Sequence, residues 1–94
     1  MGSRPPNIIL VLTDHFRPDA IGPSTPNLTR LAREGTRFHH AYCASPLCQP
    51  SRNSIITGMY PSQHGAWTLG TKLFEDVPTV GEAFQHAGYA TSLI

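Results

Sequence analysis

The sequence predicts an α/β fold in which a mainly parallel sheet is flanked by helices. Residues 7–13 are a nearly unbroken run of β-branched residues and leucine, typical of a strand buried on both faces of a parallel sheet. Residues 24–35 and 79–88 have helical periodicity with recognisable start and stop residues. Strands that alternate with helices indicate βαβ units rather than an all-α or all-β domain.

The first expected helix begins near residue 25 and ends at Gly35. Ser24 or Thr25 can cap its start, and Pro26 suits the first turn because the ring fixes a helical φ. Gly35 supplies the stop. The apolar stripe expected to face the core comprises Leu28, Leu31 and Ala32.

The second half of the chain carries further local signals. Thr79 and Glu82 have the spacing of a capping box, and Gly88 is a suitable stop for the helix that follows. Residues 36–42 and 89–94 read as two further strands. With residues 7–13, this makes three expected strands.

Residues 45–58 form the stretch with the clearest chemical content. Pro50 sets a helical φ in a first turn and Gly58 ends the segment, so Cys48 is expected at the start of a short helix. The free amides and positive dipole end of a helix stabilise negative charge held there. This position suits a nucleophile that faces an anionic substrate.

Composition excludes some partner classes. The chain has 94 residues, 39% of them hydrophobic and 14% charged, with a formal net charge of +1. These values predict one small globular domain with neither a basic field for nucleic acid nor a polybasic signal for membranes. The apolar run at 8–12 is too short to span a membrane and lacks a signal-peptide cleavage site, so a cytoplasmic location is expected.

The stretch from Cys48 to Gly58 resembles the first signature of the type I sulfatases, C-x-P-S-R-x-x-x-L-T-G. These are formylglycine-dependent enzymes of the alkaline phosphatase superfamily. The resemblance implies that Cys48 is oxidised to formylglycine by a maturation enzyme that reads Pro50 and Arg52, and that Arg52 later steadies the hydrated aldehyde. Gln49 departs from the small residues usual at its position, and isoleucine replaces the signature leucine.

Asp14 follows the first expected strand, where open α/β sheets collect ligands; from position alone it either binds a metal or caps the next turn. The resemblance makes Asp14 the first metal ligand, with His15 and the Cys48 side chain beside it. His15 departs from the family's usual second aspartate. The implied cofactor is a divalent metal, foremost Ca²⁺, with Mn²⁺, Mg²⁺ or Zn²⁺ open because imidazole suits the transition metals better.

The resemblance extends from residue 7 to residue 94. Gly88, Tyr89 and Thr91 match the opening of the family's second signature, G-Y-x-T, and the chain stops before the Gly-Lys pair that follows there. Residues 1–94 are therefore expected to be the N-terminal portion of a sulfatase catalytic domain, truncated within the second signature and inactive alone. The implied fold is alkaline-phosphatase-like, and the implied reaction is hydrolysis of a sulfate ester.

Two alternatives stay open. His15 favours a phosphonate monoesterase or phosphodiesterase of the same superfamily, because glutamine rather than aspartate is found at this position there. The second is a non-catalytic metal-binding module, although its spacing is poor for zinc. Its candidate ligands are His39, His40, Cys43, Cys48 and His64. Outside such a module, His64 belongs to a turn-rich loop expected at residues 59–65, where it either lines the site or hydrogen-bonds that loop.

Overall fold

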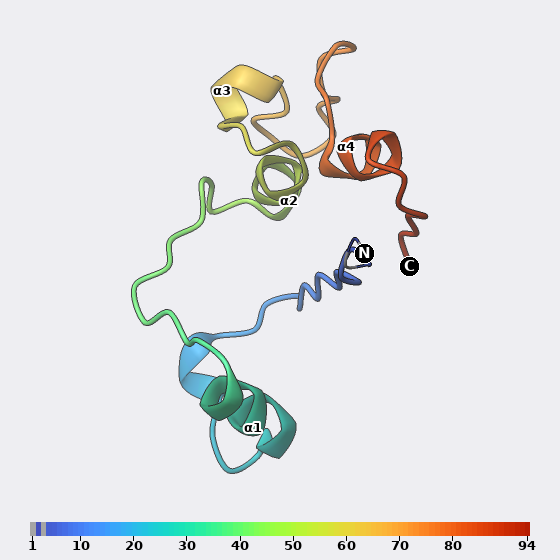
Figure 1. Cartoon of the computed structure of the whole chain (residues 1–94). Helices are drawn as coiled ribbons and strands as arrows, with labels where there is room; N and C mark the ends of the chain where they lie inside the picture. Colours follow the sequence, from blue (N-terminus) through green and yellow to red (C-terminus); the bar gives the residue numbers. More distant parts are fainter. Residues whose placement is uncertain (1, 3) are drawn as a thin grey trace. The chain divides into compact units, whose positions relative to one another are not determined.

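A computed structural model describes Gly2 and residues 4–94, and in it the chain divides into two units, Met1–His39 and His40–Ile94. No helix in this described part is long and apolar enough to cross a membrane. Figure 1 shows the helices. In chain order they are the 3₁₀ turn η1 (Pro18–Ala20), α1 (Pro26–Glu34), α2 (Cys48–Thr57), α3 (Pro61–His64) and α4 (Val80–His86).

The three expected strands are not formed. Residues 7–13, 36–42 and 89–94 have no strand assignment, so the parallel sheet is unconfirmed within the described residues. The apolar run is exposed along its length, from 48% at Leu12 to 86% at Ile9. A strand exists only when its backbone groups pair with a neighbour, and these segments have no such pairing in the described chain.

The helix predicted after residue 25 is confirmed as α1, in the unit Met1–His39. Thr25 is its N-cap residue, but its hydroxyl turns back to Gly22, accepting from that N–H at 2.9 Å and donating to its carbonyl at 3.2 Å. The expectation that the apolar stripe is core is wrong here. Leu28 is 39% and Leu31 65% exposed, because no other element of this unit covers them.

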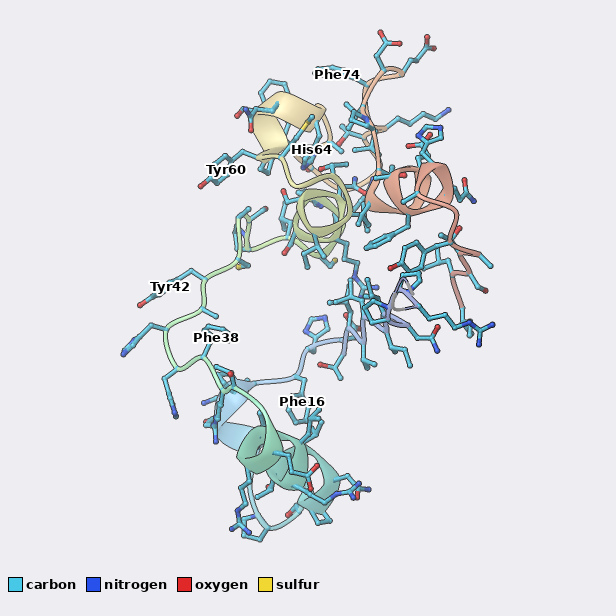
Figure 2. All side chains as sticks on the ribbon, viewed as in Figure 1. Phe16, Phe38, Tyr42, Tyr60, His64 and Phe74 are labelled. Carbon is cyan, nitrogen blue, oxygen red and sulfur yellow. The ribbon has the colours of Figure 1, made fainter. Side chains whose placement is uncertain are left out.

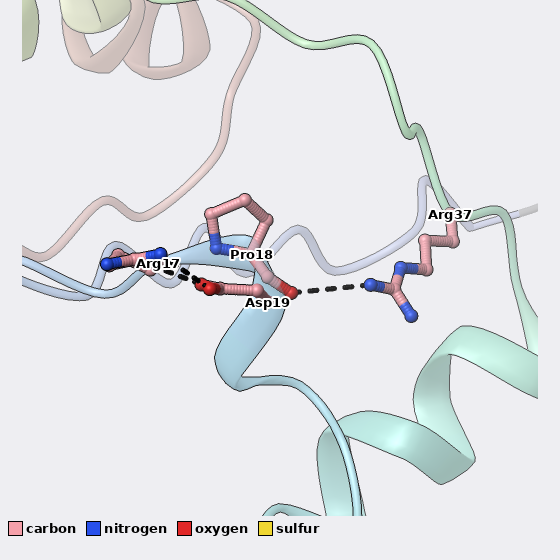
Figure 3. Close-up of polar contacts among 4 residues, drawn as sticks. All are labelled: Arg17, Pro18, Asp19 and Arg37. Carbon is pink, nitrogen blue, oxygen red and sulfur yellow. Dashed lines mark hydrogen bonds and ion pairs between the residues drawn. The ribbon is translucent and has the colours of Figure 1, made fainter.

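The segment before α1 is organised by two arginines (Figure 3). Arg17 donates to both carboxylate oxygens of Asp19, at 3.0 and 2.6 Å, across the intervening Pro18. Arg37, from beyond α1, donates to the Pro18 carbonyl at 3.3 Å. These contacts are exposed, so they order the turn more than they stabilise it.

The unit His40–Ile94 is built around α2, which packs against α3 and α4. Its predicted bounds are confirmed: α2 begins at Cys48, and Gly58 ends it in the left-handed region at φ 69°. The stretch expected to be a turn-rich loop instead contains the short helix α3, which Gly65 ends at φ 84°. Few side chains of the described residues are buried, and those that are lie in this unit.

The predicted capping box of α4 is confirmed. The Thr79 hydroxyl accepts from the Glu82 N–H at 3.3 Å, and the Glu82 carboxylate accepts from the Thr79 hydroxyl and N–H, both at 2.8 Å. These bonds, the hydroxyl foremost, hold the pKa of the Glu82 carboxyl below its ordinary value. Gly88 follows the helix at φ 86°, and the Phe84 and Tyr89 rings pack edge to face at 5.1 Å.

Candidate functional site

Cys48 is the first residue of α2, and its thiol is free and exposed. The N-cap residue, Leu47, has no side-chain acceptor and makes no capping hydrogen bond. First-turn amides of a helix have no intrahelical carbonyl to bond, so an anion held next to Cys48 would meet N–H donors and the positive end of the helix dipole.

Arg52 lies four residues after Cys48 on the same helix and is exposed. Side chains four residues apart stand on one face of a helix, one above the other. The helix therefore presents a sulfur and a guanidinium on the same side. Gly58 makes the opposite end of α2 a clean stop, so the predicted pair occupies a helix of ten residues with defined ends.

His64 is the central buried side chain of this unit, with 0% exposure (Figure 2). Its Nδ1 lies 3.1 Å from the Ala66 N–H, which can only donate. A neutral imidazole that accepts at Nδ1 carries its proton on Nε2, so Nε2–H donates to the Ser54 hydroxyl at 3.0 Å. His64 therefore joins α2 to the segment after α3. The sequence left two roles open for His64, lining the site or hydrogen bonding. The structure shows that its ring makes hydrogen bonds within the fold.

Phe74 covers the end of α3. Its N–H donates to the His64 carbonyl at 3.0 Å, and its ring lies against Gly65. A Cβ at Gly65 would meet three ring carbons at 2.6–2.7 Å. Glycine is needed here twice over, for the left-handed φ and for the close approach of the ring.

Gln49 was not among the expected functional residues, yet its side chain makes two hydrogen bonds to a distant turn. Its Oε1 accepts from the Gly70 N–H at 2.7 Å, and its Nε2 donates to the Thr71 carbonyl at 2.6 Å. We call these two bonds the Gln49 bridge. The available sequence signal was the presence of glutamine where the signature usually has a small residue.

Asp14 and His15 belong to the other unit, Met1–His39. Both are largely exposed, and His15 Nε2 lies 3.9 Å from Asp14 Oδ2. His15 is the only non-glycine of the described residues with a positive φ, at 49°. Histidine is among the residues that tolerate this left-handed conformation. The expected metal ligands Asp14 and His15 thus belong to one unit. The expected nucleophile Cys48 belongs, with Arg52, to the other.

The alternative zinc module is not supported. Within the described residues, no group of three or more His, Cys, Asp or Glu side chains could hold a metal. Both ring nitrogens of His64 are already used in hydrogen bonds, so this residue cannot serve as a ligand without breaking the buried pair. Cys43 and Cys48 are both free thiols, with no disulfide between them.

The family model for sulfatases matches residues 6–94, nearly the whole chain. The chain belongs to the sulfatase family. Membership implies the alkaline-phosphatase-like fold. The chain is 38% identical to the uncharacterized sulfatase YidJ of Escherichia coli (strain K12), over 95% of its own length and 19% of that protein. No solved structure matches it.

Other sulfatases show the same relation. Identity is 35% with the choline-sulfatase of Rhizobium meliloti (strain 1021), over 94% of this chain and 18% of that protein. Identity is 38% with the arylsulfatase of Clostridium perfringens (strain 13 / Type A), over 95% of this chain and 20% of that protein. This sulfatase chain therefore spans about a fifth of the length of the curated relatives it matches.

Proposed function

We propose that the protein containing this chain is a sulfuric ester hydrolase whose nucleophile is a formylglycine made from Cys48. The observation that carries the proposal is the position of Cys48 as the first residue of α2, free, exposed and followed by Pro50 and Arg52 at the sulfatase spacing. The relatives are named for sulfate esters, and the net reaction is R–O–SO₃⁻ plus water giving the alcohol and hydrogen sulfate.

The helix start and Arg52 provide complementary charge for this reaction. A sulfate ester brings a negative charge to the first turn of α2, where the N–H groups of Cys48 and Gln49 have no intrahelical carbonyl to bond. Arg52, one turn later on the same face, adds positive charge where oxygen charge develops as the ester bond breaks. Formylglycine supplies a hydrated aldehyde hydroxyl in place of the thiol. Its formation is an oxidation carried out by the maturation enzyme, and it replaces sulfur and two hydrogens by one oxygen.

A divalent metal is part of the proposal, with Asp14, His15 and residue 48 as ligands. Ligands that each lie about 2.0–2.6 Å from one ion stand up to roughly 5 Å apart. The 3.9 Å between Asp14 Oδ2 and His15 Nε2 fits this limit. Bound there, Ca²⁺, or Mn²⁺, Mg²⁺ or Zn²⁺, would neutralise sulfate charge. Three side chains are fewer than the six or more ligands of Ca²⁺ or the four of Zn²⁺, so further ligands are required.

The test combines mass measurement with activity, using the full-length gene product that contains this chain. Co-expression with a formylglycine-generating enzyme should change the mass of the peptide carrying Cys48 by the thiol-to-aldehyde exchange. Cys48→Ala should abolish hydrolysis of an activated aryl sulfate while substrate binding persists. Cys43→Ala is the matched control, because Cys43 is also free and exposed. Modification of Cys43 instead of Cys48 would refute the proposal.

His15 favours a second candidate, a phosphonate monoester or phosphodiester hydrolase of the same superfamily. Its imidazole stands where the sulfatase signature has a carboxylate, which removes one negative charge from the expected metal site. Rates of the same gene product on matched sulfate and phosphate esters separate the two candidates. A kcat/KM higher for the sulfate ester supports the sulfatase; the reverse order assigns the phosphate chemistry.

A further inference from the structure

We propose that Gln49 is a positioning residue, which fixes the direction of residue 48 by joining the first turn of α2 to the turn at residues 68–71. The inference rests on the proposed function, because it needs residue 48 to be the nucleophile. It concerns a residue that the sulfatase signature leaves unspecified.

The Gln49 bridge is specific in its chemistry. Its carboxamide oxygen faces an N–H donor and its carboxamide nitrogen faces a carbonyl acceptor, at 2.7 and 2.6 Å. A flipped amide would place like groups against each other at both contacts, so the partners determine the orientation. The side chain is half-buried; its bond to the Thr71 carbonyl is partly shielded from water, and its bond to the Gly70 N–H is exposed. Asparagine carries the same donor and acceptor pair, but its side chain is one methylene shorter than that of glutamine.

The turn that receives the bridge is itself closed by hydrogen bonds. The Thr71 hydroxyl donates to the Thr68 carbonyl at 2.6 Å and accepts from the Thr68 N–H at 3.3 Å. Gly70 adopts a left-handed φ of 81°, a conformation that the tight turn requires. Gln49 therefore binds a preformed loop, and its two partners are backbone groups whose spacing does not depend on side-chain rotamers.

The connection back to the buried core makes the turn a fixed reference point. The segment after the turn is held to α3 by the Phe74 N–H, which donates to the His64 carbonyl at 3.0 Å. Because Gln49 follows Cys48 directly, a change in the first turn of α2 moves residue 48 with it. A nucleophile displaced by about 1 Å can lose about a hundredfold in rate.

The experiment measures kcat and KM for Gln49→Met and Gln49→Glu in the full-length gene product, with rates divided by the fraction of chains modified at Cys48. Methionine keeps the length but neither bond; glutamate keeps the acceptor for Gly70 and loses the donor to Thr71. We expect Gln49→Met to lower kcat about tenfold with KM changed less than about twofold. The kcat of Gln49→Glu should lie between that of Gln49→Met and that of the parent. Gln85→Met is the matched control, because Gln85 also donates one side-chain bond, to Thr91 at 2.8 Å, and should keep parental kcat.

A second test changes Thr71, a residue that is not adjacent to Cys48 in the sequence. Thr71→Val removes the hydroxyl that closes the turn and should lower kcat in the same direction; combined with Gln49→Met, it should add little, since both act through one bridge. Amide exchange at Gly70 should accelerate in Gln49→Met. Unchanged exchange, or faster exchange with parental kcat, overturns the proposal. If Cys48→Ala is as active as the parent, the proposed function has failed instead, and with it the positioning role.

Discussion

Replacing His64 by alanine should destabilise the packing of α2 against α3. The imidazole is fully buried and makes two hydrogen bonds, to the Ser54 hydroxyl and the Ala66 N–H. Ala66 is also fully buried, so its N–H would lose the Nδ1 acceptor without gaining water. An unsatisfied buried donor costs about 1–3 kcal/mol, and a cavity from a truncated buried side chain adds about 2 kcal/mol or more. The expected loss is therefore roughly 3–5 kcal/mol, a large part of the 5–15 kcal/mol typical of a domain.

The measurement is hydrogen exchange, followed by mass spectrometry, on peptides covering residues 60–70 of the full-length gene product. Since about 1.4 kcal/mol corresponds to a factor of ten, protection of the Ala66 amide should fall at least about a hundredfold in His64→Ala. His64→Asn should lose less, because its amide oxygen can take the place of Nδ1 as the acceptor.

Two controls make the result interpretable. His40→Ala removes an exposed imidazole of the same unit and should leave the exchange unchanged. Ser54→Ala removes the other partner, and in combination with His64→Asn it should cost less than the sum of the single changes. Parental protection of the Ala66 amide in His64→Ala would refute the assigned tautomer and the role of the buried pair.

Three further predictions follow from the same structure. Gly65→Ala should destabilise by about 1–3 kcal/mol more than Gly88→Ala in thermal unfolding, because both glycines have positive φ but only Gly65 lies under the Phe74 ring; equal shifts would contradict this packing. Because the pKa of Glu82 is lowered, its stabilisation of α4 should be complete above the ordinary glutamate value of about 4.3 and be lost as pH falls through the lower folded value; Glu82→Gln should abolish that acid dependence in circular dichroism. Asp14→Ala should reduce bound metal and hydrolysis together, and retention of both by elemental analysis and assay would return Asp14 to turn capping.

The helices of this chain could be predicted because their signals are local. The hydroxyl of Thr79 and the carboxylate of Glu82 meet within one turn, so their spacing alone specifies the capping box. Gly58 ends α2 because its own φ of 69° suits glycine, whatever surrounds it. The start of α2 at Cys48 was predictable for the same reason, since it depends on Pro50 and the stop that follows.

The strands could not be settled in the same way. An apolar run such as residues 8–12 shows that a segment can be buried in a sheet, but its hydrogen-bond partners lie elsewhere in a chain. With those residues exposed, the described structure shows no ladder for them to join. The short helix α3 was missed because one turn of helix carries no periodicity, and Pro61 reads equally well as a turn residue.

The site was harder to predict where it depends on contacts between residues that are far apart in the sequence. Cys48 and Arg52 were identified by a pattern along the chain, whereas Gln49 and Ser54, on the same helix, act through partners that the pattern does not contain. Gln49 bonds residues 21 and 22 positions away, and no spacing rule links them. Sequence reasoning could detect only that glutamine was unusual at its position.

The two side-chain connections of α2 explain how one exposed residue can be held in a defined direction. A helix attached at one point remains free to pivot about that point. The Gln49 bridge holds its first turn, and the Ser54–His64 bond holds its second half from the buried core. Two separated attachments remove both the pivot and rotation about the helix axis. Cys48, although itself exposed, therefore stands on a helix whose orientation within its unit is determined by neighbours rather than by its own contacts.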